Sequence, residues 1–286
     1  MRLRLYKTLW GHDGTATEAA QAAVAAGFDG LEGPAPAADA ERDALAAALE
    51  GHGLDYVGEI CTAGSYVPDR RATPAEHLES LAQRLRQTAP LRPRFCNVLA
   101  GCDAWPLAVQ VDFFRRALEL ADTAGIRCSF ETHRGRSLFN PWVTEAVLEQ
   151  VPELPLTCDF SHWVVVCERL MDSEWDSVLR DTENAHHIHG RVGYDQGPQV
   201  PHPAAPEYAE ALASHQRCWE AIWRAQQRRG YAETTLTPEF GPDGYLHCLP
   251  FTGMPVSDLW ELNRWIGARE RTHFQTFLTD SAREVA

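Results

Sequence analysis

The sequence lacks several features that would assign a function at once. It contains a single lysine, Lys7, so 25 of its 26 basic residues are arginines. Schiff-base catalysis would depend on Lys7 alone, and we do not expect it. No stretch of about 18 apolar residues is present, so no segment is predicted to cross a membrane. The first residues, MRLRLYKTLWGHDG, contain no apolar run typical of a secretory signal, and we therefore expect a cytoplasmic protein.

Cysteine spacing and positive charge exclude further classes. The eight cysteines include no CxxC pair, so we expect reduced thiols rather than a zinc ribbon or a disulfide framework. The 26 basic residues face 40 acidic ones, which gives a net charge of −14. A protein that binds nucleic acid by neutralising its phosphates is not expected with this balance. The composition suits an enzyme that acts on small molecules.

The chain alternates short apolar runs with amphipathic helical patterns, without a linker or a break in composition. We predict eight strands, at residues 3–7, 28–32, 54–61, 94–99, 126–132, 154–159, 186–192 and 231–239. A helix is predicted after each strand, at residues 17–26, 38–51, 74–88, 107–124, 143–151, 172–181, 206–229 and 256–271. Eight strand–helix units predict an α/β fold, a single (β/α)8 TIM barrel, and we assign residues 1–286 to one domain.

Two connections after predicted strands are longer than a minimal strand-to-helix loop. Residues 193–205 are rich in proline and glycine, and residues 241–255 follow the last strand in the same way. Loops at this end of a barrel surround the active site. Both segments are therefore candidates for a lid or a pocket wall.

The last four predicted strands each end in side chains that bind cations. Glu131 closes the fifth strand and Asp159 the sixth, His187 and His189 lie on the seventh, and Glu239 closes the eighth. These strands are neighbours in a barrel, so their carboxyl ends meet at the same mouth. We therefore expect these side chains to lie close together.

The alternation of side chains along a strand supports this placement. Residues two positions apart share the barrel interior, whereas the residue between them faces the helices. Each candidate has a polar residue two positions before it: Ser129, Thr157, His187 and Thr237. The residues between are apolar or small in all four strands. Four strands that agree are harder to ascribe to chance than one.

Three carboxylates at a barrel mouth repel one another unless a cation lies between them. Three oxygen ligands and one imidazole suit Mn²⁺, Mg²⁺ or Co²⁺ better than a site rich in sulfur. Such an ion acts as a Lewis acid on a ketose or ketocyclitol and stabilises an enediolate, while a carboxylate removes the proton beside the carbonyl. With two carboxylates, Glu131 and Glu239, the exchange can lead to epimerisation or to aldose–ketose isomerisation.

The pattern resembles the sugar phosphate isomerase/epimerase family, within the superfamily of xylose isomerase-like TIM barrels. The matching pieces are Glu131, Asp159-x-x-His162, His187-x-His189 and Glu239. The resemblance implies one divalent metal ion, with Mn²⁺ expected and Co²⁺, Mg²⁺ or Zn²⁺ as alternatives. It implies the ligands Glu131, Asp159, His189 and Glu239, with the two glutamates also serving as acid and base. It further implies that His162 and Arg191 contact the substrate.

The seventh strand departs from the family pattern. Many members continue with lysine and aspartate, or carry a glutamate a few residues on, whereas this chain reads HIHGRVGYDQ. The departure bears on the substrate more than on the metal. The sequence leaves the identity and phosphorylation of the substrate open.

Further residues are candidates with a structural alternative for each. His187 and His133 are candidates for substrate contact, and His187 alternatively supports a metal ligand from behind. Glu59 can bind sugar hydroxyls, and Trp10 can stack on a sugar ring. Glu32, at the end of the second strand, is open to the same roles as Glu59. For the acidic residues in general, the alternative is pairing with arginines such as Arg127 or Arg134.

Rival functions remain at this stage. A dehydratase of an inosose or another keto-polyol would share the enediolate, and an oxygenase would use iron in a similar barrel. An endonuclease for abasic DNA would need further metal ligands, of which we do not find the full set. A non-catalytic sugar-binding barrel would not need all four ligands. The expected partner is a small sugar or cyclitol, without nucleic acid or membrane, and the resemblance allows a homo-oligomer.

Overall fold

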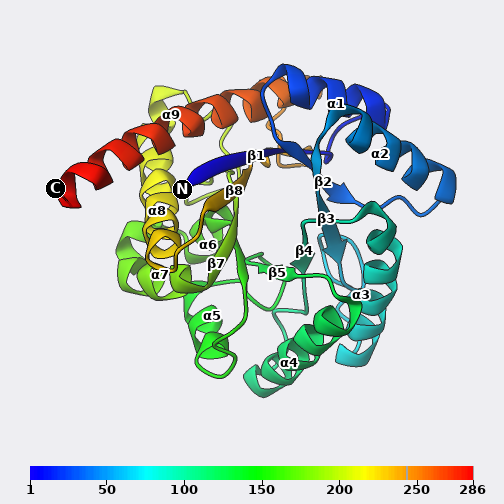
Figure 1. Cartoon of the computed structure of the whole chain (residues 1–286). Helices are drawn as coiled ribbons and strands as arrows, with labels where there is room; N and C mark the ends of the chain where they lie inside the picture. Colours follow the sequence, from blue (N-terminus) through cyan, green and yellow to red (C-terminus); the bar gives the residue numbers. More distant parts are fainter. Residues whose placement is uncertain (243, 286) are drawn as a thin grey trace.

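The computed structural model describes residues 1–242 and 244–285. Eight parallel strands pair in chain order and close into a barrel, with helices forming a ring around it (Figure 1). The strands are β1 (Arg2–Thr8), β2 (Gly30–Pro34), β3 (Asp55–Cys61), β4 (Phe95–Leu99), β5 (Cys128–Glu131), β6 (Leu156–Cys158), β7 (Ala185–His189) and β8 (Glu233–Thr237). The predicted (β/α)8 TIM barrel is confirmed.

The α-helices alternate with the strands around the ring. They are α1 (Ala16–Ala25), α2 (Asp39–His52), α3 (Pro74–Thr88), α4 (Leu107–Ala124), α5 (Pro141–Leu148), α6 (Phe160–Cys167), α7 (Trp175–Asp181), α8 (Ala209–Arg228) and α9 (Leu259–Val285). Local sequence determines several of their ends. A capping box of Thr15 and Glu18 begins α1, because the threonine hydroxyl accepts from the Glu18 amide and the glutamate accepts from the Thr15 amide. Gly125, with φ of 66°, ends α4.

Helix α6 was not predicted. It begins immediately after β6, where the sequence pattern indicated a loop, and its side chains are almost all buried. A helix that is buried on nearly every face has no amphipathic period for the sequence to display. Asp159, predicted as the last residue of a strand, is instead the residue that caps this helix.

The barrel interior is filled in layers below the mouth. Tyr6, Val57 and Phe95 form a small buried apolar cluster, separate from the main core between strands and helices. His187 lies above this cluster, with its ring centroid 5.1 Å from that of Phe95. The interior is therefore closed from below, and a ligand enters from the carboxyl ends of the strands.

Lys7 and most of the cysteines are buried among other side chains. Lys7 is buried on the outer side of β1, where its ammonium lies 4.9 Å from the ring of Trp260 in α9. It therefore does not face the barrel interior. All eight cysteines are free thiols, and six of them are buried. None of the helices in residues 1–242 and 244–285 is long and apolar enough to cross a membrane.

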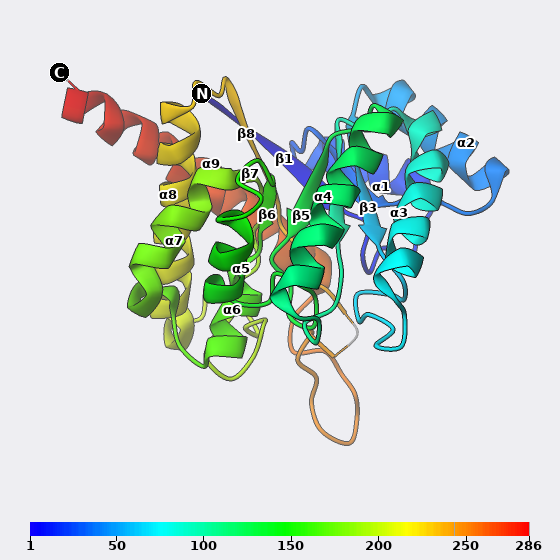
Figure 2. The ribbon, with the colours of Figure 1, turned by 90° about the horizontal axis from the view of Figure 1, so that it is seen from below.

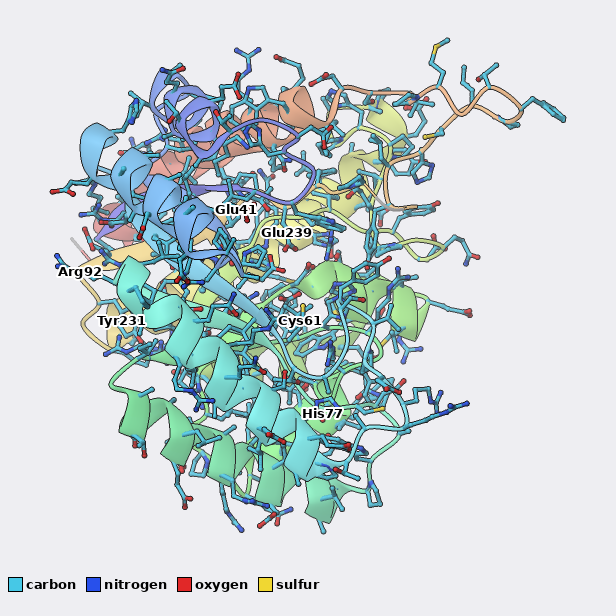
Figure 3. All side chains as sticks on the ribbon, turned by 90° about the vertical axis from the view of Figure 1, so that its right-hand side faces the viewer. Glu41, Cys61, His77, Arg92, Tyr231 and Glu239 are labelled. Carbon is cyan, nitrogen blue, oxygen red and sulfur yellow. The ribbon has the colours of Figure 1, made fainter. Side chains whose placement is uncertain are left out.

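The connection from β8 to α9 projects from the barrel (Figure 2). Figure 3 shows the same orange segment extending beyond the body of the molecule, with the side chains of its outer part clear of other elements. Phe251 and Met254 are exposed near its tip, whereas Tyr245 at its start is buried. The predicted pocket-wall segment 241–255 thus contains both a buried and a projecting part, and residue 243 lies outside the described residues.

Candidate active site

Four predicted ligands come together at the carboxyl end of the barrel. Glu131 ends β5, Asp159 follows β6, His189 ends β7 and Glu239 lies two residues past β8. Each offers a ligand atom within 4.8 Å of those of the other three, and all four side chains are buried. Four separate strand ends therefore present three carboxylates and one imidazole to a single point.

The imidazole of His189 faces the two glutamates with one nitrogen. Its Nδ1 lies 3.0 Å from Oε2 of Glu239 and 3.6 Å from Oε2 of Glu131. The geometry is not that of a hydrogen bond, so this buried nitrogen has no hydrogen-bond partner among the described residues. Such an atom, surrounded by carboxylate oxygens, is the arrangement that a bound cation would satisfy.

The other nitrogen of His189 is held from below by Glu32 of β2. Nε2 donates to Oε1 of Glu32 over 2.9 Å, which leaves Nδ1 as the nitrogen that faces Glu131 and Glu239. Glu32 also accepts from His187 Nε2 over 3.1 Å and from the hydroxyl of Thr237. Burial opposes ionisation of Glu32, but the two histidines lower its pKa below the usual range. A buried carboxylate behind a ligand histidine is a recurrent support in metal sites.

The surrounding charge favours a cation at His189. Burial opposes protonation, yet Glu239, Glu32 and Glu131 together raise the pKa of His189 well above its ordinary value. Burial raises the pKa of Glu131, with further contributions from Glu239 and Asp159. Positive charge placed among these groups, as a proton or a metal ion, relieves their repulsion.

Asp159 has two structural partners. Its Oδ1 accepts from the amide and the hydroxyl of Ser161, over 2.9 and 2.6 Å, and so caps α6. Its Oδ2 accepts from Nη2 of Arg191 over 2.5 Å. The same guanidinium nitrogen lies 3.4 Å from Oε2 of Glu239. Arg191, rather than Arg127 or Arg134, is therefore the arginine that pairs with these carboxylates.

Two further histidines stand beside the four-ligand group. The rings of His133 and His162 are 3.8 Å apart between centroids, and His162 Nε2 lies 2.7 Å from Nη2 of Arg191. Burial lowers the pKa of both histidines well below the ordinary value, and Arg191 adds to the effect. Both are neutral. Glu131, His133 and His162 also lie close enough together to hold an ion, and the guanidinium of Arg191 borders this group as well as the four-ligand group.

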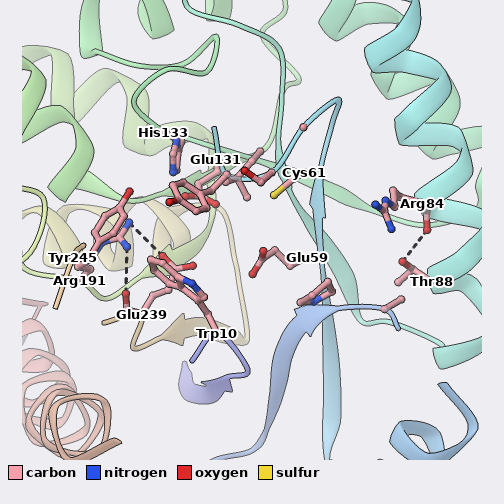
Figure 4. Close-up of a pocket in the computed structure, with 16 residues that line it drawn as sticks. Trp10, Glu59, Cys61, Arg84, Thr88, Glu131, His133, Arg191, Glu239 and Tyr245 are labelled. Carbon is pink, nitrogen blue, oxygen red and sulfur yellow. Dashed lines mark hydrogen bonds and ion pairs between the residues drawn. The ribbon is translucent and has the colours of Figure 1, made fainter. Parts of the chain in front are cut away.

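A cavity of about 280 Å³ opens above these residues (Figure 4). Glu131, His133, Arg191 and Glu239 line one end of it. Trp10, Tyr66 and Tyr245 form an aromatic wall, with centroids 5.2 to 6.3 Å apart. The guanidinium of Arg191 lies 4.8 Å from the Tyr245 ring. The volume is at the small end for ligand pockets and suits a single small molecule.

The other end of the cavity is formed by β3. Glu59 and Cys61 line it together with Leu99, Thr88 and Arg84. In Figure 4 the carboxylate of Glu59 points into the open space between Trp10 and Cys61. Burial raises the pKa of Glu59 to about 8, and Glu239, Glu32 and Glu131 contribute in the same direction. A third glutamate thus shares the cavity with Glu131 and Glu239.

The structure separates the predicted site residues into layers. The residues that line the cavity are Trp10, Glu59, Glu131, His133, Arg191 and Glu239. Asp159, His162 and His189 are buried directly behind them. His187 is deeper, bonded to Glu32 and to the hydroxyl of Thr235, and does not line the cavity. It therefore occupies the supporting position that the sequence left open as its second role.

Sequence reasoning missed Asn97 of β4. Its amide donates to Oε2 of Glu131 over 2.6 Å and holds that carboxylate toward His189. Asn97 is the only polar residue in the strand sequence FCNVL, and this was the available signal. Tyr66, in the loop after β3, was also missed, and nothing in its sequence surroundings distinguishes it.

Comparison with known proteins agrees with the architecture. The family model described as xylose isomerase-like TIM barrel matches residues 20–194. No curated protein matches the sequence significantly. Solved structures with the same fold include an L-ribulose 3-epimerase, at 16% identity and a TM-score of 0.69, with 100% of this chain and 99% of that chain covered.

Two other solved structures cover nearly the whole chain. The D-allulose 3-epimerase from Methylomonas sp. has 16% identity and a TM-score of 0.63, with 95% of this chain and 98% of that chain covered. The probable 3-DHS dehydratase AsbF from Bacillus anthracis has 15% identity and a TM-score of 0.59, with 94% and 99% covered. At these identities the likeness establishes the fold.

Proposed function

Because the chain belongs to the family of xylose isomerase-like TIM barrels, we propose that it is a divalent-metal-dependent isomerase or epimerase of a sugar or cyclitol. One observation carries the proposal. His189 Nδ1, without a hydrogen bond, lies between Glu131 and Glu239 at the base of a small cavity. The 3-epimerases of the same fold act on small sugars, which suits a cavity of this size.

The donor set fits one hard divalent cation. Glu131, Asp159, His189 and Glu239 would hold it, and Mn²⁺ is the ion we expect, with Co²⁺, Mg²⁺ and Zn²⁺ as alternatives. When bound, the ion would polarise the substrate carbonyl and stabilise the enediolate formed beside it. Glu32 and Asn97 keep the ligand atoms in place before any ion arrives.

Proton transfer is assigned to the two glutamates that line the cavity. Glu131 and Glu239 reach His189 from different strands, so a substrate held above it has one carboxylate on either side. One removes the proton next to the carbonyl and the other returns a proton to the opposite face, or to the neighbouring carbon. The first outcome is epimerisation and the second is isomerisation. Arg191 and neutral His133 would orient substrate oxygens, with His162 behind them.

The cavity argues against the nuclease alternative. It is small, and its inner end carries several carboxylates, whereas a DNA backbone requires an extended basic surface. We also retain a cytoplasmic location and self-association as predictions.

The first test is the metal content of untagged protein purified without chelator. About one equivalent per chain is expected, measured by inductively coupled plasma mass spectrometry. The metal-loaded protein is then incubated with ketoses and inososes in deuterated water, and exchange of the proton beside the carbonyl is followed by NMR. An enzyme that binds no metal, even on titration, would contradict the proposal.

The role of Glu239 in proton transfer is tested by a substitution. Glu239→Gln should retain the fold and lower turnover by at least about 100-fold, because a positioned proton-transfer group contributes that much. Glu153→Gln, at an exposed position away from the cavity, is the matched control. Near-full activity in Glu239→Gln would remove this residue from the mechanism. A product that has lost water would assign the protein as a dehydratase instead.

A further inference from the structure

Glu59 is a carboxylate without a partner in the proposed active site. It lies on β3, lines the cavity and points into it (Figure 4). Among the described residues it forms no hydrogen bond and no ion pair. Its side chain is partly exposed, and a carboxyl group that loses its water to a ligand without gaining a hydrogen bond is destabilised. A ligand that supplies donors would remove that cost.

The nearby arginines are already engaged. Arg191 is bonded to Asp159 and Ser161. Arg136 is buried and donates to backbone carbonyls, including that of Thr62 over 2.6 Å. Neither guanidinium forms a hydrogen bond or an ion pair with Glu59.

The other polar groups at this end of the cavity do not donate to Glu59 either. Arg84 is exposed, and its guanidinium donates to Oε1 of Gln87 over 3.2 Å. The hydroxyl of Thr88 donates to the Arg84 carbonyl over 2.8 Å. Burial raises the pKa of the Cys61 thiol, which keeps it uncharged. Hydrogen-bond partners for Glu59 must therefore come from the ligand that fills the cavity.

The position of Glu59 separates it from the proton-transfer groups. Glu131 ends β5 and Glu239 follows β8, whereas Glu59 comes from β3, across the mouth of the barrel. A substrate whose carbonyl and adjacent hydroxyl lie over His189 would extend its remaining carbons toward β3. The cavity of about 280 Å³ has room for one such molecule between the aromatic wall and Leu99.

We propose that Glu59 determines substrate specificity by forming hydrogen bonds with hydroxyl groups at the end of the substrate remote from the metal. The substrate class is then an uncharged polyhydroxy ketone. A phosphate or carboxylate at the remote end is rejected, because it brings further negative charge into a cavity that is already lined by Glu59, Glu131 and Glu239. This inference rests on the proposed function and narrows it.

The test compares Glu59→Leu, Glu59→Gln and the control Glu153→Gln, each loaded with Mn²⁺. Deuterium exchange is measured with D-fructose, D-ribulose and 2-keto-myo-inositol, and with D-fructose 6-phosphate and D-ribulose 5-phosphate. The wild type should exchange at least one of the unphosphorylated compounds and discriminate against the phosphates. Glu59→Leu should raise KM for the preferred ketone about 3- to 10-fold, the range for a lost hydrogen bond. The change in kcat should be smaller, and Glu59→Gln should be intermediate.

Binding without turnover gives an independent measurement. The Mn²⁺-loaded wild type and Glu59→Leu are each titrated with myo-inositol and with xylitol in a calorimeter. Glu59→Leu should bind more weakly than the wild type to each polyol that the wild type binds. Metal content and thermal melting of the variant should match the wild type, which separates lost recognition from lost folding.

The outcomes distinguish this inference from the proposed function. If the wild type exchanges only phosphorylated sugars, or if Glu59→Leu leaves both KM and polyol binding unchanged, the role of Glu59 is overturned and the metal-dependent reaction stands. If the Mn²⁺-loaded wild type exchanges no proton in any ketone, both fail together.

Discussion

Glu32 accepts a hydrogen bond from His189 across the barrel interior, from β2 to β7, over 2.9 Å. The bond occupies Nε2 and directs Nδ1 to the carboxylates of Glu131 and Glu239. Two residues 157 positions apart in the chain therefore determine which nitrogen is available to a ligand. The orientation of the imidazole is established in the protein itself, before an ion binds.

This relationship predicts the effect of Glu32→Gln. The variant keeps the size of the side chain but loses the negative charge that supports His189 and His187. We expect the affinity for Mn²⁺ to fall about 10- to 100-fold, the usual consequence of losing a carboxylate behind a ligand histidine. Titration calorimetry on metal-free protein measures it. Glu153→Gln serves as control, and equal affinities for Glu32→Gln and wild type would show that Glu32 only fills space.

Arg191 supplies a second prediction, on stability. It is buried and paired with Asp159, and also lies 3.4 Å from Glu239. Arg191→Met removes one side of a buried charge pair, which costs about 3–5 kcal/mol in the absence of metal. Mn²⁺ should restore more stability to the variant than it adds to the wild type, because it replaces the lost positive charge.

Thermal melting with and without Mn²⁺ tests this coupling. Arg116→Met is the matched control, since Arg116 is half-exposed and its ion pair with Asp112 lies on the surface of α4. The control should melt within a few degrees of the wild type, with the same response to metal. An identical metal response in Arg191→Met would mean that Arg191 and the proposed ion do not compensate the same carboxylates.

The sequence predicted the barrel and the convergence of its strand ends, for a clear physical reason. Alternation of strand and helix patterns specifies the order of elements, and parallel strands bring their carboxyl ends to one mouth. Glu131, Asp159, His189 and Glu239 could therefore be placed together without coordinates. Asp159 was assigned to a strand rather than a helix cap, but its position at the mouth was the same.

Contacts across the barrel could not be predicted in this way. Glu32 was seen as the end of a strand, yet its pairing with His189 depends on the register between strands that are not neighbours. The free carboxylate of Glu59 is equally invisible in the sequence, since pairing with arginines was an equal expectation. Side-chain partners depend on interior packing, which local pattern does not determine.

The last prediction concerns Asp181, which does not line the cavity. This residue ends α7, is buried, and neither carboxylate oxygen has a hydrogen-bond partner among the described residues. Burial raises its pKa to about 8, and Glu145 adds to the shift while Arg180 opposes it. In the unfolded chain the group titrates near its ordinary value of about 4.

The sign of the pH dependence follows from these two values. Between about pH 4 and pH 8 the folded protein holds a proton at Asp181 that the unfolded chain has released, so stability falls as pH rises through this window. The slope is at most about 1.4 kcal/mol per pH unit. Asp181→Asn removes the titration, so its free energy of unfolding should gain on the wild type steadily from pH 5 to pH 8 in urea titrations. Asp176 is exposed on the same helix, and Asp176→Asn should keep the wild-type dependence of unfolding free energy on pH. A difference in unfolding free energy between Asp181→Asn and wild type that stays constant at all pH values would mean that Asp181 is ionised in the folded protein.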